Sequence, residues 1–402
     1  MKVVYVVPRY GTEVIGGAEY GARMLAEHLV VAGAQVEVCT TCAVDSVTWA
    51  DHYPPGTVEV NGVTVRRFRS VSGRHPYFDR LSAEVLADPA AASPAEERHW
   101  IDWQGPVCPD ALDAAAASGA DVIAFYPYLF WPTVAGVGRF GPRAVLHPAT
   151  HDEAPIRLPV FRRVFTSVGG LVFHTAEERQ LTERLFPGVA ALPQAVVGLG
   201  VTPGDGDERQ ARSALGIGDR PFLLCVGRVD EGKGSSLLYD FFVAYRARHP
   251  GELALVLAGP VVSPLPPHPD VFVTGPIDEA VKWGALRGAE LLVSPSPLES
   301  FSLVLLEAWL AGRPVLVNAA CRVTRRHAEL AGGGLWFDSY ATFEVALERL
   351  LDDDGLRASL ARAGAAYVDR RYGWPRLIDR YQRFLKGVAE RATTGRSPSP
   401  PG

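Results

Sequence analysis

The sequence predicts an α/β protein with two doubly wound domains, each built on a mainly parallel sheet. Short apolar runs alternate with amphipathic helical segments over most of the 402 residues, which is the rhythm of βαβ units. That rhythm is interrupted by the polar, Gly- and Pro-rich stretch 201–221 and then restarts. The length is also sufficient for two or three domains. These three observations fix the expected fold class.

In the N-terminal half, a β-rich run at 3–7 is followed by a loop over 8–17 and an amphipathic helix over 18–31. Further expected elements are a helix at 177–185 and strands at 36–40, 121–125, 143–146 and 170–174. Residues 73–115 break the strand rhythm and carry several aromatic side chains. They are interpreted as a helical insertion with an aromatic core or as part of an acceptor-binding surface, and the two interpretations are compatible.

The C-terminal half repeats the alternation after the polar stretch. Expected strands lie at 222–226, 253–258, 271–273, 290–294 and 314–318, and expected helices at 235–248 and 303–311. Beyond residue 342 the pattern is helical. We therefore expect a first domain over 1–198, a second over 199–374, a helix over 375–391 that returns to the first domain, and a disordered tail over 392–402.

The overall composition is that of a soluble globular protein. Hydrophobic residues make up 48% and charged residues 21% of the sequence. The formal net charge is −5, so the chain lacks the excess positive charge that binds a nucleic acid or an anionic membrane. No apolar stretch approaches the roughly 18 residues that would span a bilayer, and the apolar run at the N-terminus is too short for a signal-peptide core. Of five cysteines, Cys39 and Cys42 have the spacing of half a zinc site, but the sequence has no second CxxC or His pair to supply the other two ligands. A cytoplasmic protein with reduced thiols is expected.

The motif Gly227–Ser236, "GRVDEGKGSS", follows an expected strand and is nearly a nucleotide-binding P-loop. Gly234 stands where that loop needs a hydroxyl for Mg²⁺, and two carboxylates lie between its glycines. Arg228 and Lys233 are instead interpreted as two cations that reach a diphosphate from a strand–helix loop. A solvated turn that caps the next helix is the alternative.

The second motif, "SPSPLESFSLVLLEAWLAGRP" (294–314), is a strand end, a loop and a short helix. The first turn of that helix, near Phe301, Ser302 and Leu303, has free N–H donors suited to an anion. Glu307 is the one charge of an apolar helix and is expected to reach back toward the loop, unless it marks a solvated stripe. Glu299 and Glu307 are about 12 Å apart on a helical rise, which disfavours a glycosidase pair.

Two loops of the first half complete the candidates. In "HPATHDEAP" (147–155), Pro148 argues against a helix that presents both histidines to a metal. His151 and Asp152 are therefore better candidates for contact with a polar substrate, and a structural histidine is the alternative. Gly16 and Gly17, before Glu19, lack the GxGxxG spacing but permit close approach of an anion to a helix start.

Together these residues resemble the retaining glycosyltransferases of family four, which have the GT-B architecture of two Rossmann-like domains facing across a cleft. The resemblance covers nearly the whole chain. Its most specific parts are "GRVDEGKG" and the Glu-x7-Glu element "ESFSLVLLE" followed by "AWLAGRPVLV". "GGAEYGARMLAEHLVVAGAQVEV" is similar to the opening of the family's acceptor domain.

The resemblance implies a role for each candidate. Arg228 and Lys233 would bind the donor diphosphate, Glu307 the ribose hydroxyls and Glu299 the transferred sugar. Donor contacts are also implied for the backbone of Phe301, Ser302 and Leu303 and for Gly16 and Gly17. His151 would lie beside the sugar, so the implied catalytic set is Arg228, Lys233, Glu299 and His151. Candidate acceptor contacts are Glu19, Trp100, Trp103 and Asp152.

The implied activity is sugar transfer from a nucleoside-diphosphate sugar, with UDP the first choice of nucleotide and GDP the second. No metal and no cofactor are expected, because no Asp-x-Asp element is evident and two cations can stabilise the leaving group. The family often has Gly where Ser300 and Ser302 stand, so the sugar-facing loop is bulkier and the sugar is left open.

The acceptor and the biological setting follow less directly from the sequence. A soluble small molecule is expected, and the Arg- and Ala-rich composition suggests a bacterial protein of specialised metabolism such as antibiotic biosynthesis. No nucleic acid or integral membrane partner is expected, and the protein is expected to be a monomer or homodimer. A nucleotide-sugar 2-epimerase or hydrolase on the same scaffold, or a non-catalytic nucleotide-binding protein, is the alternative.

Overall fold

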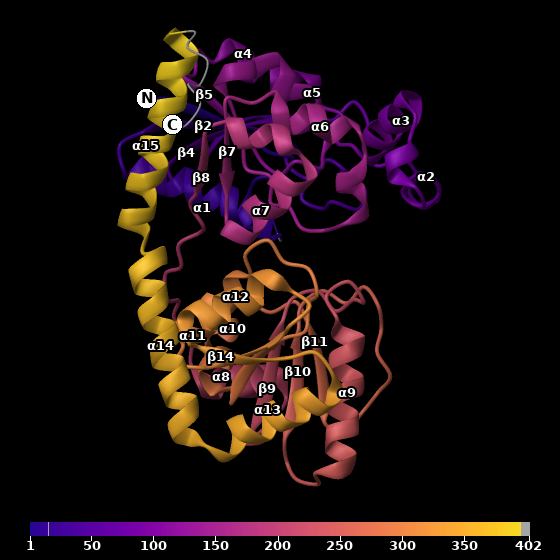
Figure 1. The fold of residues 1–402 in the computed structure, drawn as a ribbon, viewed down its shortest axis with the longest axis vertical. Coiled ribbons are helices and arrows are strands. Elements are labelled where there is room, and N and C mark those ends of the chain that lie inside the picture. The colour runs from indigo at the N-terminus through magenta and orange to yellow at the C-terminus, as the bar shows by residue number, and fades with distance from the viewer. Residues whose placement is uncertain (15, 395–402) are drawn as a thin grey trace. The chain divides into compact units, whose positions relative to one another are not determined.

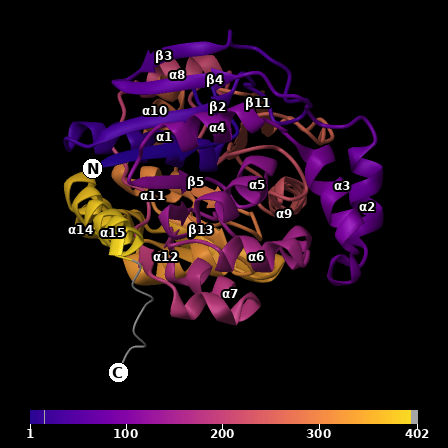
Figure 2. The same cartoon turned by 90° about the horizontal axis from the view of Figure 1, so that it is seen from above.

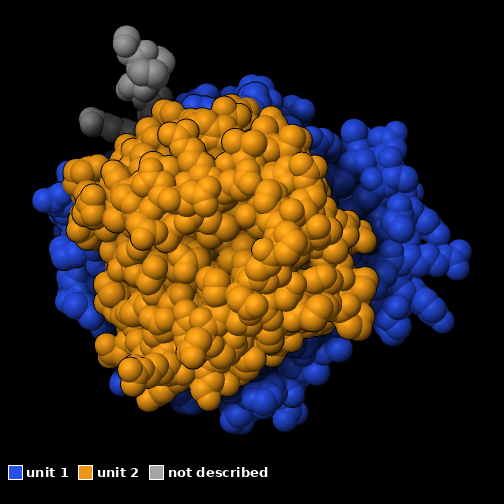
Figure 3. Space-filling model, turned by 90° about the horizontal axis from the view of Figure 1, so that it is seen from below, with its two compact units in different colours: residues 1–199, 374–402 blue, residues 200–373 orange. Residues whose placement is uncertain are grey.

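The computed structural model describes residues 1–14 and 16–394. The chain divides into two compact units (Figures 1 and 3). Unit 1 contains residues 1–199 and the C-terminal segment from Trp374, and unit 2 contains Gly200–Gly373. Each unit has its own sheet and its own hydrophobic core, so each is described by itself.

Unit 1 is built on an eight-stranded sheet in the order β3-β4-β2-β1-β5-β6-β7-β8. Its strands are β1 (Lys2–Val6), β2 (Gln35–Thr41), β3 (Gly56–Val60), β4 (Val63–Phe68), β5 (Val122–Phe125), β6 (Ala144–Leu146), β7 (Gly170–Phe173) and β8 (Gln194–Val196). All pairs are parallel except β3 with β4. The central strands are continuous apolar runs because both faces of a parallel sheet are covered by helices.

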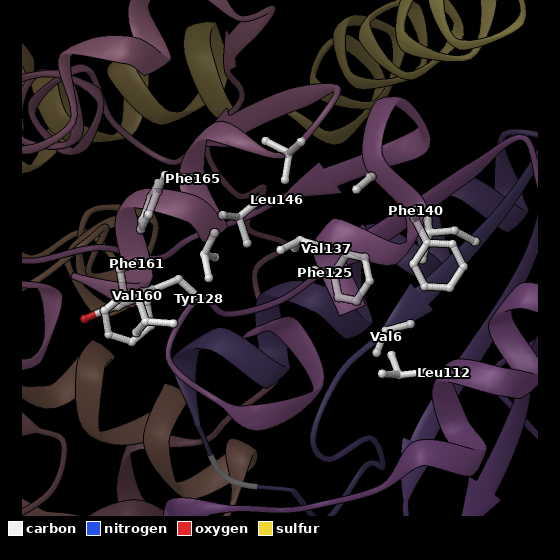
Figure 4. Packing of buried hydrophobic residues seen from close by; sticks show 14 of the residues in the cluster. Val6, Leu112, Phe125, Tyr128, Val137, Phe140, Leu146, Val160, Phe161 and Phe165 are labelled. Atoms are coloured by element: carbon white, nitrogen blue, oxygen red, sulfur yellow. The ribbon is translucent and has the colours of Figure 1, made fainter. Parts of the chain in front are cut away.

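The helices of unit 1 follow these strands in the chain. They are α1 (Gly17–Val31), α2 (Phe78–Leu86), α3 (Pro94–Gln104), α4 (Pro109–Ala117), α5 (Trp131–Phe140), α6 (Val160–Thr166), α7 (Ala176–Leu185) and α15 (Trp374–Thr394), with short 3-10 turns at Pro89–Ala91, Gly141–Arg143, Ala154–Arg157 and Pro187–Ala191. One core cluster joins Val6, Leu112, Phe125 and Phe140 between the sheet and its helices (Figure 4). The helices α2 and α3 lie side by side in both ribbon views (Figures 1 and 2).

Unit 2 has a six-stranded, fully parallel sheet in the order β11-β10-β9-β12-β13-β14. Its strands are β9 (Phe222–Val226), β10 (Ala254–Ala258), β11 (Val271–Gly275), β12 (Leu291–Ser294), β13 (Val315–Asn318) and β14 (Gly334–Phe337). Its helices are α8 (Glu208–Leu215), α9 (Ser235–Arg248), α10 (Glu279–Gly288), α11 (Leu303–Leu310), α12 (Arg322–Ala331), α13 (Tyr340–Asp352) and α14 (Asp354–Tyr372).

Both sheets reverse their strand order at one point, and these points locate the candidate sites. Counted from β9, unit 2 has the Rossmann order 3-2-1-4-5-6, with the reversal between β9 and β12. In unit 1 the order reverses between β1 and β5. Ligands of open α/β sheets bind outside the carboxyl ends of the strands at such a switch point. The loops after β9, β12, β1 and β5 are therefore the informative ones.

The expected strands and helices are confirmed with small differences at their ends. The β3–β4 hairpin was not predicted, although its turn, Asn61-Gly62, has the positive φ angles (49° and 79°) that favour this dipeptide. The predicted disorder of 392–402 is wrong for its first three residues, because Ala392–Thr394 continue α15. The remainder of that segment lies outside the described residues.

Candidate functional site

The two loops at the switch point of unit 2 are joined by an ion pair. Lys233 lies in the loop after β9 and Glu299 in the loop after β12. The Lys233 Nζ lies 2.7 Å from the Glu299 Oε1, and the two side chains are 32% and 17% exposed. The structure therefore brings together two residues that the sequence placed in separate motifs, at the position where a Rossmann-like sheet binds its ligand.

The backbone after Lys233 explains why no hydroxyl residue follows it. Gly234 has a φ of +72° and precedes α9, a conformation that glycine adopts at little cost. A Cβ atom at Gly234 would also lie 2.5 Å from the carbonyl oxygen of Pro295. Asp230 fixes the same turn, since its Oδ1 accepts from the Lys233 N–H at 2.7 Å. The motif is thus a turn packed on the neighbouring loop, which leaves no room for the P-loop hydroxyl.

Arg228, the second predicted cation, is the more exposed of the two. Its Nε lies 3.3 Å from the Asp230 Oδ2, and its side chain is 60% exposed. An ion pair this exposed contributes little to stability and exchanges easily with water. Arg228 thus lies in the same loop as Lys233 but near the surface, where its guanidinium can exchange Asp230 for another partner.

Glu307 is buried rather than on a solvated stripe, so that alternative for the α11 carboxylate is wrong. It is 6% exposed, and its Oε1 lies 2.8 Å from the Nζ of Lys282 at the start of α10. Burial raises the pKa of Glu307, and the Lys282 ammonium opposes that rise. Burial alone would lower the pKa of Lys282, but Glu307 and Glu279 more than offset it, so the pKa is raised. Lys282 was missed from the sequence, where the only signal was the rarity of lysine.

The start of α11 has a strained residue and an inward-facing aromatic ring. Ser302 precedes the helix with a φ of +68° and without a side-chain cap hydrogen bond. Phe301 is 3% exposed and packs edge-on against His327 and Tyr372. The Phe301 side chain therefore belongs to the interior of unit 2, and the predicted donor contact through its backbone stays a prediction. In the first turn, the Leu305 N–H donates to the Ser302 carbonyl at 3.3 Å, whereas the N–H groups of Leu303 and Val304 precede the first acceptors of the helix.

In unit 1, Gly16 and Gly17 begin α1 after the β1 loop. A Cβ atom at Gly16 would lie 2.2 Å from the Glu19 Oε2, while one at Gly17 would meet nothing within 4 Å. Glu19 is 7% exposed and accepts from the Nε of the buried Arg9 at 3.0 Å. Gly16 thus makes room for a buried ion pair, and Gly17 is the glycine with open space beside it.

His147 and His151 have different environments. His147 is fully buried, and its Nε2 lies 2.8 Å from the Tyr381 hydroxyl of α15. Burial lowers the pKa of His147 well below its usual value. The His151 side chain is 33% exposed, with its Nδ1 3.6 Å from Glu153. Asp152 lies beside it and pairs with Arg157 at 2.5 Å. Of the two histidines, His151 is thus the one open to a ligand, and Asp152 beside it is exposed as well.

The two candidate tryptophans of the 73–115 insertion also differ. Trp100 is 2% exposed, packs on Phe78 and donates from its Nε1 to the Ser82 hydroxyl at 3.1 Å. This burial favours the aromatic-core interpretation for Trp100. Trp103 is half-buried and stacks on His75, with ring centroids 3.8 Å apart. Trp103 is therefore the accessible aromatic of the pair.

Within residues 1–14 and 16–394, no group of three or more His, Cys, Asp or Glu side chains is arranged to hold a metal ion. In the same residues, no helix has both the length and the apolar character needed to cross a membrane.

The candidate residues of unit 2 lie in a segment that matches a known family model. Residues 207–367 match the model described as "Glycosyl transferases group 1", and Arg228, Lys233, Lys282, Glu299 and Glu307 all fall within that segment. The chain is 29% identical over 361 residues to a D-inositol 3-phosphate glycosyltransferase of Frankia alni, which covers 78% of this chain and 87% of the relative.

Solved structures agree on the fold. Sucrose-phosphate synthase from Thermosynechococcus elongatus has a TM-score of 0.70 at 18% identity, over 96% of this chain and 99% of that one. HepE from Anabaena, in complex with UDP and glucose, has a TM-score of 0.69 at 14% identity, over 96% and 100%. The chain thus has the GT-B fold of these structures, and its segment 207–367 is similar to the group 1 glycosyl transferases. The matched segment and the Frankia relative both indicate a glycosyltransferase.

Proposed function

We propose that the protein transfers a sugar, with retention of configuration, from a nucleoside-diphosphate sugar to a hydroxyl group of a small-molecule acceptor. The observation that carries this proposal is the Lys233–Glu299 pair at the switch point of unit 2. It places a cation and a carboxylate together where a nucleotide is expected. The pair also lies inside the segment that matches the group 1 family.

On the donor side, Arg228 and Lys233 bind the diphosphate and stabilise its growing charge as the bond to the anomeric carbon breaks. Glu307 accepts from the ribose hydroxyls, Glu299 contacts the transferred sugar, and the first-turn amides of α11 bind phosphate. The bond electrons pass to the diphosphate, which accepts the proton of the acceptor hydroxyl as the new bond forms on the same face. UDP is the first choice of nucleotide, supported by the UDP complex of the HepE neighbour, and GDP is the second.

On the acceptor side, Gly16, Gly17 and His151 are assigned to the reacting sugar, and Asp152 and Trp103 to the acceptor. The name of the Frankia relative, D-inositol 3-phosphate glycosyltransferase, supports a small polyhydroxylated acceptor. A role in bacterial specialised metabolism belongs to the same proposal and is supported only by composition.

The test is transfer from a panel of UDP- and GDP-sugars by the full chain and by the variants Arg228→Ala and Lys233→Ala. Each variant is expected to lower kcat by about 10²–10³, the usual loss when one group that stabilises transition-state charge is removed. Lys386→Ala, which removes an exposed lysine of α15, is the matched control. Unchanged turnover in both site variants would refute the proposal.

The products separate the alternatives. Retention requires that the anomeric configuration of the donor survive in the product, which NMR of the product resolves. An altered or hydrolysed sugar formed from the donor alone would instead indicate an epimerase or a hydrolase. Nucleotide binding without turnover of any donor would indicate a non-catalytic protein.

A further inference from the structure

A buried carboxylate in unit 1 has no role in the proposed chemistry so far. Glu178, in the first turn of α7, is 1% exposed. No ion pair found among residues 1–14 and 16–394 includes its carboxylate. A buried carboxylate of this kind is costly unless several donors satisfy it, so its hydrogen bonds indicate what the residue holds in place.

The donors come from two separate segments. The Glu178 Oε1 accepts from the backbone N–H of Thr150 at 2.8 Å, and the Thr150 hydroxyl lies 3.2 Å from the same oxygen. The Glu178 Oε2 accepts from the N–H of His174 at 2.6 Å. Thr150 precedes His151 in the loop after β6, and His174 follows β7. The carboxylate therefore ties the loop that carries His151 to the end of the neighbouring strand.

The loop needs such a tie because its backbone is strained. Ala149 has a φ of +55°, and a residue with a Cβ atom in the left-handed region costs roughly 1–2 kcal/mol. The Pro148 carbonyl accepts from the Tyr128 N–H at 3.2 Å on one side of Ala149. Glu178 holds Thr150 on the other side. A strained residue persists when its surroundings over-determine it, and these two contacts do so here.

Capping of α7 does not account for the contact with Thr150. The N-cap of this helix is Thr175, whose hydroxyl accepts from the Glu178 N–H at 3.1 Å. The Oε1 of Glu178 points instead to the β6 loop. We propose that Glu178 is a positioning residue, which fixes the backbone of Ala149–Thr150 and thereby the position of His151. The inference rests on the proposed function for the role of His151, but the tie itself does not.

The tie is tested in the full chain by hydrogen exchange of the segment 148–153 in Glu178→Gln. Gln keeps one acceptor oxygen and replaces the other by an NH₂ group, which cannot accept from a backbone N–H. At about pH 8, where the Glu178 carboxyl is ionised, exchange in this segment is expected to be at least about tenfold faster than in the wild type, since a charged acceptor of two segments is lost. Glu183→Gln, in the same helix with its partly exposed carboxylate 3.9 Å from Arg179, is the control. Unchanged exchange in Glu178→Gln would overturn the proposal.

A double-mutant cycle with His151→Ala tests the positioning role. Glu178→Gln is expected to lower kcat about tenfold in the wild-type background with little change in the Kd for UDP, because small misplacements of a reacting group are costly. In the His151→Ala background the same substitution is expected to change kcat less than about twofold, because residues that act through one another are non-additive.

Equal losses in the two backgrounds would show a general structural effect and overturn the positioning role. Failure of the proposed function has a different signature, namely no transfer by the wild type from any donor. In that event the exchange experiment still decides whether Glu178 holds the loop.

Discussion

At the scale of single residues, the candidate donor site is internally neutralised. Arg228 pairs with Asp230, Lys233 with Glu299, and Lys282 with Glu307. The sequence predicted the charged residues of the first two motifs but not these pairings. The Lys233–Glu299 contact joins positions 66 residues apart, and such a contact depends on strand order, which no local pattern contains. A diphosphate that binds here must therefore replace a carboxylate as the partner of Lys233.

This exchange of partners predicts opposite effects of Glu299→Gln on binding and turnover. The Kd for UDP is expected to fall by up to about fivefold, because Lys233 no longer has to leave a partly exposed ion pair worth at most about 1 kcal/mol. By contrast, kcat is expected to fall at least about tenfold, because the sugar loses a charged acceptor. Calorimetry with UDP and initial rates measure the two quantities.

The exposed Glu231 of the same loop provides the control, since Glu231→Gln should change neither quantity. Weaker UDP binding by Glu299→Gln would contradict the competition between Glu299 and the diphosphate for Lys233.

Glu178 makes the stability of unit 1 depend on pH. Burial raises the pKa of its carboxyl from 4.5 to about 7, against the opposing hydrogen bonds of His174 and Thr150. The folded state therefore binds this proton more tightly than the unfolded state. The resulting stabilisation is complete below about pH 4.5 and is lost as the pH rises through about 7.

Glu178→Gln should remove this dependence. A shift of that size corresponds to about 3 kcal/mol. The free energy of unfolding of the wild type, relative to Glu178→Gln, should thus fall by about 3 kcal/mol between roughly pH 4.5 and pH 7.5. Hydrogen exchange of the most protected amides of unit 1, compared between the two proteins at several pH values, measures the difference. An equal pH dependence in the two proteins would contradict it.

At the scale of elements, the start of α11 shows the backbone strain that follows from a serine at a position where the family often has glycine. The family often has Gly where Ser302 stands. Ser302 has a φ of +68° and its side chain makes no cap hydrogen bond. This serine therefore has the conformational cost of a left-handed residue without the usual benefit of a capping hydroxyl.

Ser302→Gly is accordingly expected to stabilise the protein by about 0.5–1 kcal/mol. The substitution relieves the backbone strain of the folded state, but the greater conformational freedom of glycine in the unfolded state offsets part of this gain. Hydrogen exchange of the most protected amides of unit 2 measures the change. Ser302→Ala keeps the Cβ atom and the strain, so it should not stabilise. If the Gly and Ala variants were equally stable, the strain argument would be wrong.

The regular elements were predictable to different degrees. Phe222–Val226 and Ser235–Arg248 were predicted with the bounds that the structure gives, because each has a clear apolar pattern with turn residues on both sides. The strand β4 was missed because two adjacent arginines interrupt the apolar alternation of its sequence, VTVRRF. Its partner β3 is almost entirely exposed, so apolar periodicity could not indicate it.

At the scale of the whole molecule, strand order explains why the functional loops are so far apart in the sequence. The repeated alternation of strands and helices predicted two sheets, and each sheet reverses its order once. The loops of Lys233, Glu299 and Gly16 follow strands at these reversals, whereas the loop of His151 follows β6, the neighbour of β5. The sequence placed a domain boundary after residue 374, and unit 2 ends at Gly373, between α14 and α15.

The proposed position of the nucleotide within unit 2 predicts where a ligand should protect the full chain. A ligand that binds only the folded state stabilises it by about 2.7 kcal/mol at 100 times its Kd. The unfolding of a chain with two units need not be two-state, so a single midpoint would be ambiguous. Segment-resolved hydrogen exchange avoids this ambiguity, because local opening is measured separately for each segment.

With UDP at that concentration, exchange should slow most in Gly227–Gly234 and Pro295–Leu303, the two loops joined by Lys233 and Glu299. The helix α13 of the same unit serves as the internal reference, and Arg228→Ala should remove most of the protection at the same UDP concentration. If the two loops gained no more protection than α13, the nucleotide would not bind at the switch point between β9 and β12, and the assignment of Arg228, Lys233 and Glu299 to the donor would fail with it.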